Sequence, residues 1–301
     1  MTLLKGPAES RPALPATKAP NRVRRQIRLG RVLLQVFLAG GLFVMLYPLL
    51  WMLASSVKPE NEIFGSASLW PEEFVLTNYP EGWVAGQSSF SLYLRNSAVI
   101  AILAVIGNVV SCTLAAFAFA RLKFRFRGGW FAIMLLTMMV PYHVVVVPQY
   151  IVFRTLGWID TILPLVVPKF FAVDGFFVFL MVQFIRGLPR DLDEAAEIDG
   201  CGPFRVFVRI VLPLTTPAMV TTAIFTFMWT WDDFFGQLIY LNDFTNFTVP
   251  LGLAALQAST YGSQWGKLMA MSVISLIPTT AFFLLAQRRL IEGISTTGIR
   301  G

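Results

Sequence analysis

The stretch NSAVIAILAVIGNVVSCTLAAFAFA, Asn96–Ala120, contains no charged residue. An α-helix needs about 20 predominantly apolar residues to cross the hydrocarbon core of a bilayer, so this run is long enough for one transmembrane helix. The whole chain fits that interpretation, because 56% of its 301 residues are hydrophobic and only 14% are charged. Soluble globular domains contain about 25% charged residues. The composition excludes an ordinary soluble domain, a disordered chain, a collagen and a disulfide scaffold, and it predicts an all-α polytopic membrane protein.

Five more apolar runs are long enough to cross a membrane. In chain order, the fourth run contains Lys169 and Asp174, and the fifth contains Asp232 and Asp233. Charged side chains inside a membrane span are functional candidates, because it is costly to bury them in lipid. The sequence therefore predicts six transmembrane helices, over the runs Val32–Val57, Asn96–Ala120, Gly128–Phe153, Thr161–Ile185, Leu214–Leu241 and Leu268–Gln287.

The basic residues alternate with these runs in a regular way. All but five of the 24 lysines and arginines fall before the first run, between the second and third, between the fourth and fifth, or after the sixth. In a six-span zigzag these segments share one side of the membrane, and the positive-inside rule makes that side cytoplasmic. The net charge of +7 therefore indicates cytoplasmic loops in contact with anionic membrane lipid, and no nucleic-acid partner is expected.

This topology predicts the organisation of the chain. We expect a disordered cytoplasmic tail over residues 1–31, a first transmembrane helix over 32–57 and an extracytoplasmic segment over 58–92. A membrane core of five helices is expected over 93–288, with a cytoplasmic loop at 186–213. Residues 289–301 then form a second cytoplasmic tail, so that both termini are cytoplasmic.

Few residues suit catalysis or metal binding. The chain has one histidine, His143, and two cysteines, which leaves no obvious metal ligand set. Gly262–Lys267 resembles a phosphate-binding loop, but that motif needs four residues between its glycines and a Ser or Thr after the lysine. Here three residues separate the glycines, and Leu268 follows the lysine. We therefore expect no catalytic residue, metal or nucleotide site on this chain, and we interpret His143 as a packing or hydrogen-bonding residue.

The cytoplasmic loop at 186–213 carries the most distinctive pattern. The stretch EAAEIDG, Glu194–Gly200, is followed after nine residues by IVLP, Ile210–Pro213. Asp191 or Asp193 is placed to cap a short helix with an acidic first turn, and Gly200 ends that helix. A second short helix is expected over Phe204–Leu212. Such a pair lies on the membrane surface or inserts into a groove of a partner protein, and the residues alone leave both interpretations open.

This pattern, E-A-A-x3-G-x9-I-x-L-P, resembles the signature cytoplasmic loop of the membrane subunits of binding-protein-dependent ABC importers. The resemblance runs from about Leu33 to the end of the chain. It departs from the family at Asp232, where Asn is more usual, and at Lys169 and Asp174, where uncharged residues are expected. Further stretches resemble the carbohydrate-uptake branch, the maltose-type G and glycerol-3-phosphate-type E subunits: Trp231–Phe234, Phe247–Leu253 and Gly293–Gly301. The loop matches the family at every fixed position: Glu194, Ala195, Ala196, Gly200, Ile210, Leu212 and Pro213.

The resemblance implies a type I ABC importer permease fold in a bacterial or archaeal cytoplasmic membrane. It implies three kinds of partner: a second homologous permease, two ATP-binding cassette subunits, and an extracytoplasmic solute-binding protein. ATP and Mg²⁺ would be bound by the ATPase subunits, so this chain would be no enzyme and would hold no cofactor. The seven matched loop residues would couple the chain to the ATPases. The solute would be a sugar or a related compound: an oligosaccharide, a monosaccharide, a polyol or a sugar phosphate.

Four residues are candidates for the solute pathway: Asp174, Trp231, Asp232 and Asp233. In a continuous fourth helix, Asp174 would lie about 15 Å from Pro164 at 1.5 Å per residue, near the membrane midplane. It would then face a water-filled route or the partner permease. Aromatic rings stack on sugars and carboxylates accept hydrogen bonds from hydroxyls, so the other three residues suit solute contact. Alternatively, they are an interfacial tryptophan and two solvated acids.

Two other classes of protein compete with the importer. The intramembrane charges would also serve an ion-coupled secondary transporter, but such folds commonly contain inverted repeats and no internal repeat is visible here. A membrane-embedded hydrolase would need a converging set of histidine, serine or carboxylate side chains, which a single histidine disfavours.

Overall fold

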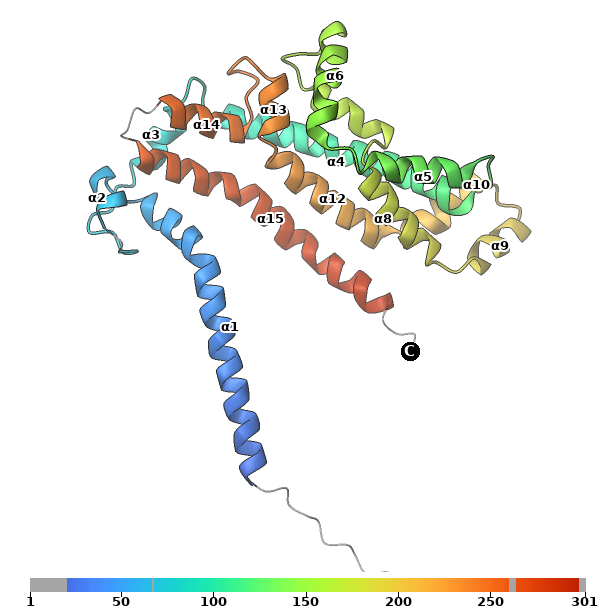
Figure 1. Cartoon of the computed structure of the whole chain (residues 1–301), viewed down its shortest axis with the longest axis horizontal. Coiled ribbons are helices and arrows are strands. Elements are labelled where there is room, and N and C mark those ends of the chain that lie inside the picture. The colour runs from blue at the N-terminus through green and yellow to red at the C-terminus, as the bar shows by residue number, and fades with distance from the viewer. Residues whose placement is uncertain (1–20, 67, 260–263, 298–301) are drawn as a thin grey trace, which may run out of the picture. The chain divides into compact units, whose positions relative to one another are not determined.

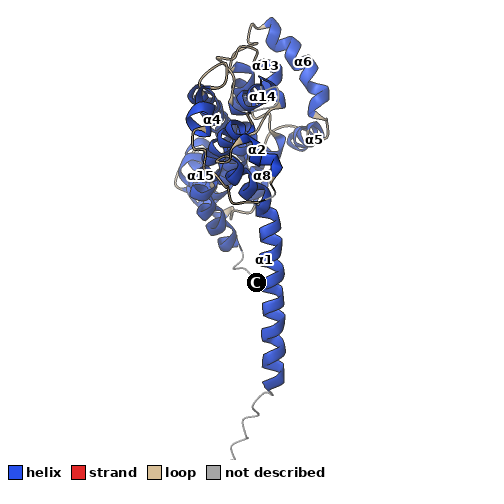
Figure 2. Cartoon of the chain, turned by 90° about the vertical axis from the view of Figure 1, so that its left-hand side faces the viewer, coloured by secondary structure: helices blue, strands red, loops and turns tan. Residues whose placement is uncertain are grey.

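The computed structural model describes residues 21–66, 68–259 and 264–297, with only the backbone at 21–30, 259 and 288–297. Within these ranges the regular elements are helices, and no strand occurs among them (Figure 2). The chain divides into two units, residues 1–51 and 52–301. The first unit contains most of helix α1 (Asn21–Ser55), and the second contains the remaining helices. The all-α fold class predicted from the sequence is confirmed.

The second unit is built from helices of very different lengths. Their bounds are α2 Glu60–Gly65, α3 Asn78–Val84, α4 Phe90–Arg121, α5 Arg127–Thr137, α6 Tyr142–Thr155, α7 Leu163–Val166, the 3₁₀ helix η1 Val167–Phe171, α8 Gly175–Arg186, α9 Asp191–Ile198, α10 Pro203–Val206, the π-helical turn η2 Phe207–Val211, α11 Leu212–Leu214, α12 Thr216–Trp231, α13 Phe235–Tyr240, α14 Val249–Ser259 and α15 Trp265–Thr297.

Helix α4 is the packing centre of this unit. It packs against α8 and α12, and α12 also packs against α15 (Figure 1). Cys112, Ala116 and Ala120 recur every four residues on α4, and none is more than 2% exposed. These small side chains allow close helix packing. Met181 and Ile185 of α8 are fully buried in the same hydrophobic cluster.

In the part of the chain that the structure describes, the helices that could cross a membrane are four long segments and two bent pairs, and the second pair includes part of the predicted cytoplasmic loop. The long segments of the described residues are Arg31–Ser55, Phe90–Arg121, Leu163–Arg186 and Trp265–Gln287. Helix α5 meets α6 at a bend of 99°, and the segment Pro203–Leu214 meets α12 at a bend of 72°. If each bent pair counts as one span there are up to six, so the predicted number is the upper limit that these helices allow.

Three expected continuous helices are wrong. The run Gly128–Phe153 turns between α5 and α6, where Pro141 lacks an N–H donor and disfavours helical backbone in the residue before it. The fourth run is interrupted between η1 and α8, where Ala172 has a φ of +53°. Asp174 directly precedes α8, so it does not lie midway along an unbroken helix. The fifth run, Leu214–Leu241, is interrupted between the end of α12 at Trp231 and the start of α13 at Phe235.

The ends of the predicted segments also shift. Helix α1 begins at Asn21, before the expected start at Val32, and α15 continues to Thr297, beyond Gln287. Residues 1–20 and 298–301 of the two predicted tails lie outside the described residues. Helix α14 is an additional apolar helix that the sequence prediction missed, and it packs against α4 and α15.

The extracytoplasmic segment predicted at 58–92 folds against the start of α15. The Glu60 carboxylate accepts hydrogen bonds from the backbone N–H groups of Trp265 and Gly266, at 2.7 and 3.1 Å. These N–H groups have no partner within the helix, and a negative charge there also complements the helix dipole. Lys267 adds an ion pair with Glu81 at 3.0 Å. The segment therefore holds the N-terminal end of α15 in place.

Candidate functional site

The loop between α8 and α12 forms two short helices joined by a tight turn, as the sequence predicted. Helix α9 ends at Ile198 and α10 begins at Pro203. Gly200, between them, has a φ of +77°, a conformation that residues with a side chain rarely adopt. A Cβ atom added at Gly200 would meet nothing within 4 Å, so the backbone conformation, and not crowding, favours glycine here.

Apolar side chains and one ion pair hold this loop on the helix core. Phe207 and Val211 are buried, and the Phe207 ring lies 4.9 Å from the ring of Phe117 on α4. The Nε atom of Arg121 lies 3.0 Å from Oδ2 of Asp193, and both side chains are mostly buried. Neither Asp191 nor Asp193 caps α9, because no side chain makes a capping hydrogen bond there. That expectation was wrong: Asp193 is in the first turn and pairs with Arg121.

The opposite face of the loop is exposed. Ile198 is 87% exposed and Phe204 is 74% exposed, on either side of the Gly200 turn. The seven residues that match the family pattern divide between the two faces. Glu194, Ala195, Gly200 and Pro213 are exposed, Ala196 is buried in the core, and Ile210 and Leu212 are partly buried against it. The loop thus has one face buried against the helix core and one exposed face that contains both charged and apolar groups.

A cavity of about 670 Å³ lies between α5, α6, the broken fourth segment, α12 and α13. Lys169 and Asp174 lie on opposite sides of the break in the fourth segment, and their Nζ and Oδ2 atoms are 2.8 Å apart. A smaller hollow of about 350 Å³ shares Lys169 and Asp233 with this cavity and extends to Gln237. The cavity is lined mainly by apolar and aromatic side chains, with these polar groups among them: Tyr142, Gln149, Lys169, Asp174, Asp233 and Tyr240.

Contacts from α4 fix the shape of the broken segment. The Ser111 hydroxyl donates a hydrogen bond of 2.7 Å to the backbone carbonyl of Lys169. Gly107 leaves room for the ring of Phe170, which a Cβ atom at that position would overlap. The two contacts tie η1 to α4, next to the interruption at Ala172 that separates η1 from α8.

The structure brings together two of the four predicted pathway residues. Asp174 and Asp233 line the cavity, whereas Trp231 is 3% exposed and its Nε1–H donates to the carbonyl of Ser275 at 3.2 Å. Asp232 is exposed outside the cavity. The tryptophan that lines the cavity is Trp229, two residues earlier. Residues two apart on a helix point to different faces, so a sequence motif centred on Trp231 could not identify it.

His143 is exposed and makes an aromatic contact with α13. Its ring lies 4.9 Å from the ring of Phe235. Among the described residues no group of three or more histidine, cysteine, aspartate or glutamate side chains could hold a metal ion.

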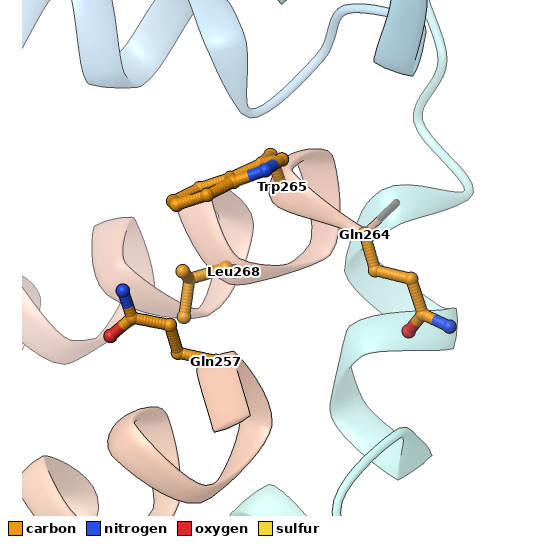
Figure 3. A pocket seen from close by; sticks show the side chains of 4 residues that line it. All are labelled: Gln257, Gln264, Trp265 and Leu268. Atoms are coloured by element: carbon orange, nitrogen blue, oxygen red, sulfur yellow. The ribbon is translucent and has the colours of Figure 1, made fainter. Parts of the chain in front are cut away.

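A third hollow, between α14 and the start of α15, is much smaller than the other two. Figure 3 shows Leu268 between Trp265 and Gln257, with Gln264 pointing away from them. Its volume is about 10 Å³, room for about one water molecule, so it is no solute site.

Sequence comparison relates the chain to transport permeases. A family described as "Binding-protein-dependent transport system inner membrane component" matches residues 107–294. The chain is 32% identical to the sn-glycerol-3-phosphate transport system permease protein UgpE of Agrobacterium fabrum, over 89% of this chain and 97% of the relative. It is 31% identical to the trehalose/maltose transport system permease protein MalG of Thermococcus litoralis, over 92% of this chain and 99% of the relative.

Two solved structures share the fold. One is a bacterial ABC transporter involved in the import of the acidic polysaccharide alginate; one of its chains matches with a TM-score of 0.75 and 19% identity, over 88% of this chain and 97% of that chain. The other is a bacterial alginate ABC transporter in complex with an alginate pentasaccharide-bound periplasmic protein. It matches with a TM-score of 0.61 and 15% identity, over 88% of this chain and 94% of that chain.

Proposed function

Because the chain belongs to the family of binding-protein-dependent transport system inner membrane components, we propose that it forms half of the solute pathway of an ATP-driven importer. In this proposal a second, homologous permease forms the other half. Two ATP-binding cassette subunits bind from the cytoplasm, and an extracytoplasmic solute-binding protein delivers the solute. The chain is a multi-pass membrane permease, and the proposal adds that both of its termini are cytoplasmic.

The exposed turn around Gly200 is the observation on which this proposal depends. It presents Ile198 and Phe204, two large apolar side chains, beside the charge of Glu194. Exposed apolar side chains rimmed by charge are typical of surfaces that bind other proteins. We therefore assign this face to the ATPase subunits in preference to the membrane surface. ATP and Mg²⁺ then belong to those subunits, and the chain itself catalyses no reaction.

The proposed solute is a sugar or a related polyhydroxyl compound. The names of the two relatives include a sugar phosphate and two disaccharides, and the two solved structures are of alginate transporters. The cavity offers aromatic rings and carboxylates, which suit sugar rings and hydroxyl groups. We place the solute route along this cavity, with Asp174, Asp233 and Trp229 as lining residues.

The test is transport by the assembled complex in proteoliposomes, with its binding protein supplied outside. Uptake of a saccharide from a test panel should require ATP inside the vesicle and should persist when an uncoupler collapses the ion gradients. Uptake that stops with the uncoupler and continues without ATP would support the alternative, an ion-coupled secondary transporter that uses the intramembrane charges.

A further inference from the structure

The one cation that lines the large cavity is already paired with a carboxylate. Lys169 is the only cationic residue among its lining residues, and its Nζ atom lies 2.8 Å from the Asp174 carboxylate. Asp233 is a second carboxylate on the same wall, and its Oδ1 atom accepts the backbone N–H of Gly236 at 2.9 Å. The cavity therefore has no cation free to bind an anion.

An anionic solute that enters this cavity would lose more free energy of hydration than its interactions with the cavity wall return. A charged group that leaves water needs an opposite charge or several hydrogen-bond donors to compensate for its lost hydration. A phosphate or carboxylate would have to compete with Asp174 for Lys169, and it would face the repulsion of Asp233. An uncharged solute meets neither cost.

Two tyrosine hydroxyls of the cavity wall are placed to bind such a solute. Tyr240 is only 2% exposed, and its hydroxyl makes no hydrogen bond of normal geometry within the described part of the chain. The hydroxyl of Tyr142, its polar neighbour, lines the same cavity. A buried hydroxyl that lacks a well-formed hydrogen bond can gain one from a ligand hydroxyl. The Trp229 ring, held 5.2 Å from Phe177, provides an aromatic face nearby.

From these observations we propose that the cavity is a subsite for uncharged, hydroxyl-rich solutes and that it excludes their anionic forms. The inference rests on the proposed function and narrows its solute class to neutral saccharides and polyols, without sugar phosphates and uronates. The specificity would come from Lys169, Asp174 and Asp233 together, because two carboxylates outnumber the one cation.

Charged thiol reagents test the electrostatic part directly. A Val173→Cys variant places a thiol on the cavity wall, and Cys201→Ser removes the partly exposed native thiol, while Cys112 is fully buried. The complete complex is treated with a cationic and an anionic methanethiosulfonate, and each rate is divided by its rate with a free thiol. The same Cys201→Ser protein without Val173→Cys gives the background. Gln87→Cys, which is exposed and does not line the cavity, is the control.

After division by the free-thiol rates, the cationic reagent should react with the Val173→Cys thiol at least about fivefold faster than the anionic reagent does. A difference of this size is expected for a unit charge a few ångströms away. Asp233→Asn should lower the ratio of the cationic to the anionic rate, and Lys169→Gln should raise it. The Gln87→Cys control should show a ratio near one. Equal rates at Val173→Cys, or a faster anionic reagent, would overturn the proposal. A thiol that reacts with neither reagent would overturn it as well, because the cavity would then not be open to water.

A solute panel separates this inference from the proposed function. ATPase activity of the complex is measured with neutral di- and trisaccharides and with the uronate and 6-phosphate forms of the same sugars. Stimulation by a neutral saccharide and by none of the anionic forms is expected. Stimulation by an anionic form would contradict the inference alone, whereas stimulation by no compound of either kind would contradict the proposed function.

The Tyr240 hydroxyl gives a matched pair of variants. Tyr240→Phe should raise the saccharide concentration for half-maximal stimulation by about three- to tenfold, the effect of one lost hydrogen bond. Tyr150→Phe is the control, since its ring stacks on that of Tyr240 at 6.4 Å but does not line the cavity. Equal effects of the two variants would contradict the role of the Tyr240 hydroxyl.

Discussion

Arg121, the last residue of α4, forms an ion pair with Asp193 in the first turn of α9, and their Nε and Oδ2 atoms lie 3.0 Å apart. The Arg121 side chain also donates to the backbone carbonyl of Leu188 at 3.0 Å. One guanidinium therefore joins the central helix of the molecule to the loop that we assign to the ATPase subunits. Motion of that loop would reach α4 through a direct polar contact as well as through packing.

Asp193→Asn should loosen this connection. Because Arg121 would be left mostly buried without its partner charge, we expect a loss of about 1–3 kcal/mol in the stability of the loop. Hydrogen exchange of the α9 amides should become faster, and uptake should fall while the complex still assembles. Asp191→Asn, an exposed acid in the same helical turn, is the control and should leave exchange unchanged. Identical exchange in the two variants would contradict the connection.

The two tryptophans of α12 should respond differently to truncation. Trp229→Ala removes a cavity-lining ring that is 54% exposed, so solute affinity should fall several-fold with little loss of stability. Trp231→Ala removes a buried ring and should destabilise the fold by about 3–5 kcal/mol, as large-to-small core substitutions do. Thermal unfolding and solute-stimulated ATPase activity, measured on both variants, separate these effects. If instead Trp231→Ala lowered solute affinity and Trp229→Ala lowered stability, the solute contact would have to be assigned to Trp231.

The orientation of the chain predicts which thiols an impermeant reagent can reach. Glu73→Cys, on the exposed part of the 58–92 segment, should react from outside intact cells, and Pro189→Cys, before α9, should not. Both positions are exposed, so burial does not explain a difference between them. Gly82, in contrast, is a poor labelling site because its surroundings are filled by Lys267 and Met271. Labelling at Pro189→Cys in intact cells would contradict the predicted orientation.

An acid-sensitive contact outside the spans involves Asp160. Some burial acts to raise the pKa of its carboxyl, but hydrogen bonds from the backbone N–H groups of Asn242 and Asp243 outweigh it and hold the pKa below its usual value. A depressed pKa in the folded state gives stability that is present above the unfolded pKa of about 3.9 and is lost as the pH falls through the folded pKa. The thermal midpoint of the wild-type complex should therefore exceed that of Asp160→Asn at pH 6, and the gap should close below about pH 4. A gap that persists at pH 2.5 would argue against this contact.

The sequence predicted those features that short-range chemistry decides. The Gly200 turn and its two flanking helices could be foreseen because glycine and proline act on the backbone around them. The interrupted fourth segment could not, because an apolar run reports only that a stretch can enter a membrane. Its break at Ala172 depends on Ser111 and Gly107 of another helix, and no local signal in the run encodes that contact.

The same limit applies to the candidate site. Lys169, Asp174 and Asp233 were recognised as unusual charges within apolar runs, yet their convergence depends on the break in the fourth segment and on the end of α12. Trp229 and Tyr240 carried no signal of this kind, since aromatic residues are common throughout such spans. Only the fold identifies which rings face the cavity.

In the proposed importer the Gly200 turn couples transport to the ATPase subunits, and Glu194→Lys should test the charge of that surface. Glu194 is exposed and makes no ion pair in the described ranges, so its replacement should leave the chain inserted at normal levels. The loss of a favourable helix-dipole contact alone, worth roughly 0.3–1 kcal/mol, would leave uptake nearly unchanged. We expect weaker ATPase binding and no uptake.

The most direct measurement compares Gly200→Val with Gly202→Val in ATP-driven uptake, at matched levels of inserted protein. Both glycines are exposed in open space, but only Gly200 has a positive φ, whereas Gly202 has a φ of −72° that valine accepts. The account predicts that Gly200→Val abolishes uptake and releases the ATPase subunits during purification, while Gly202→Val retains both. Uptake near the wild-type rate in Gly200→Val would contradict the coupling role of this loop.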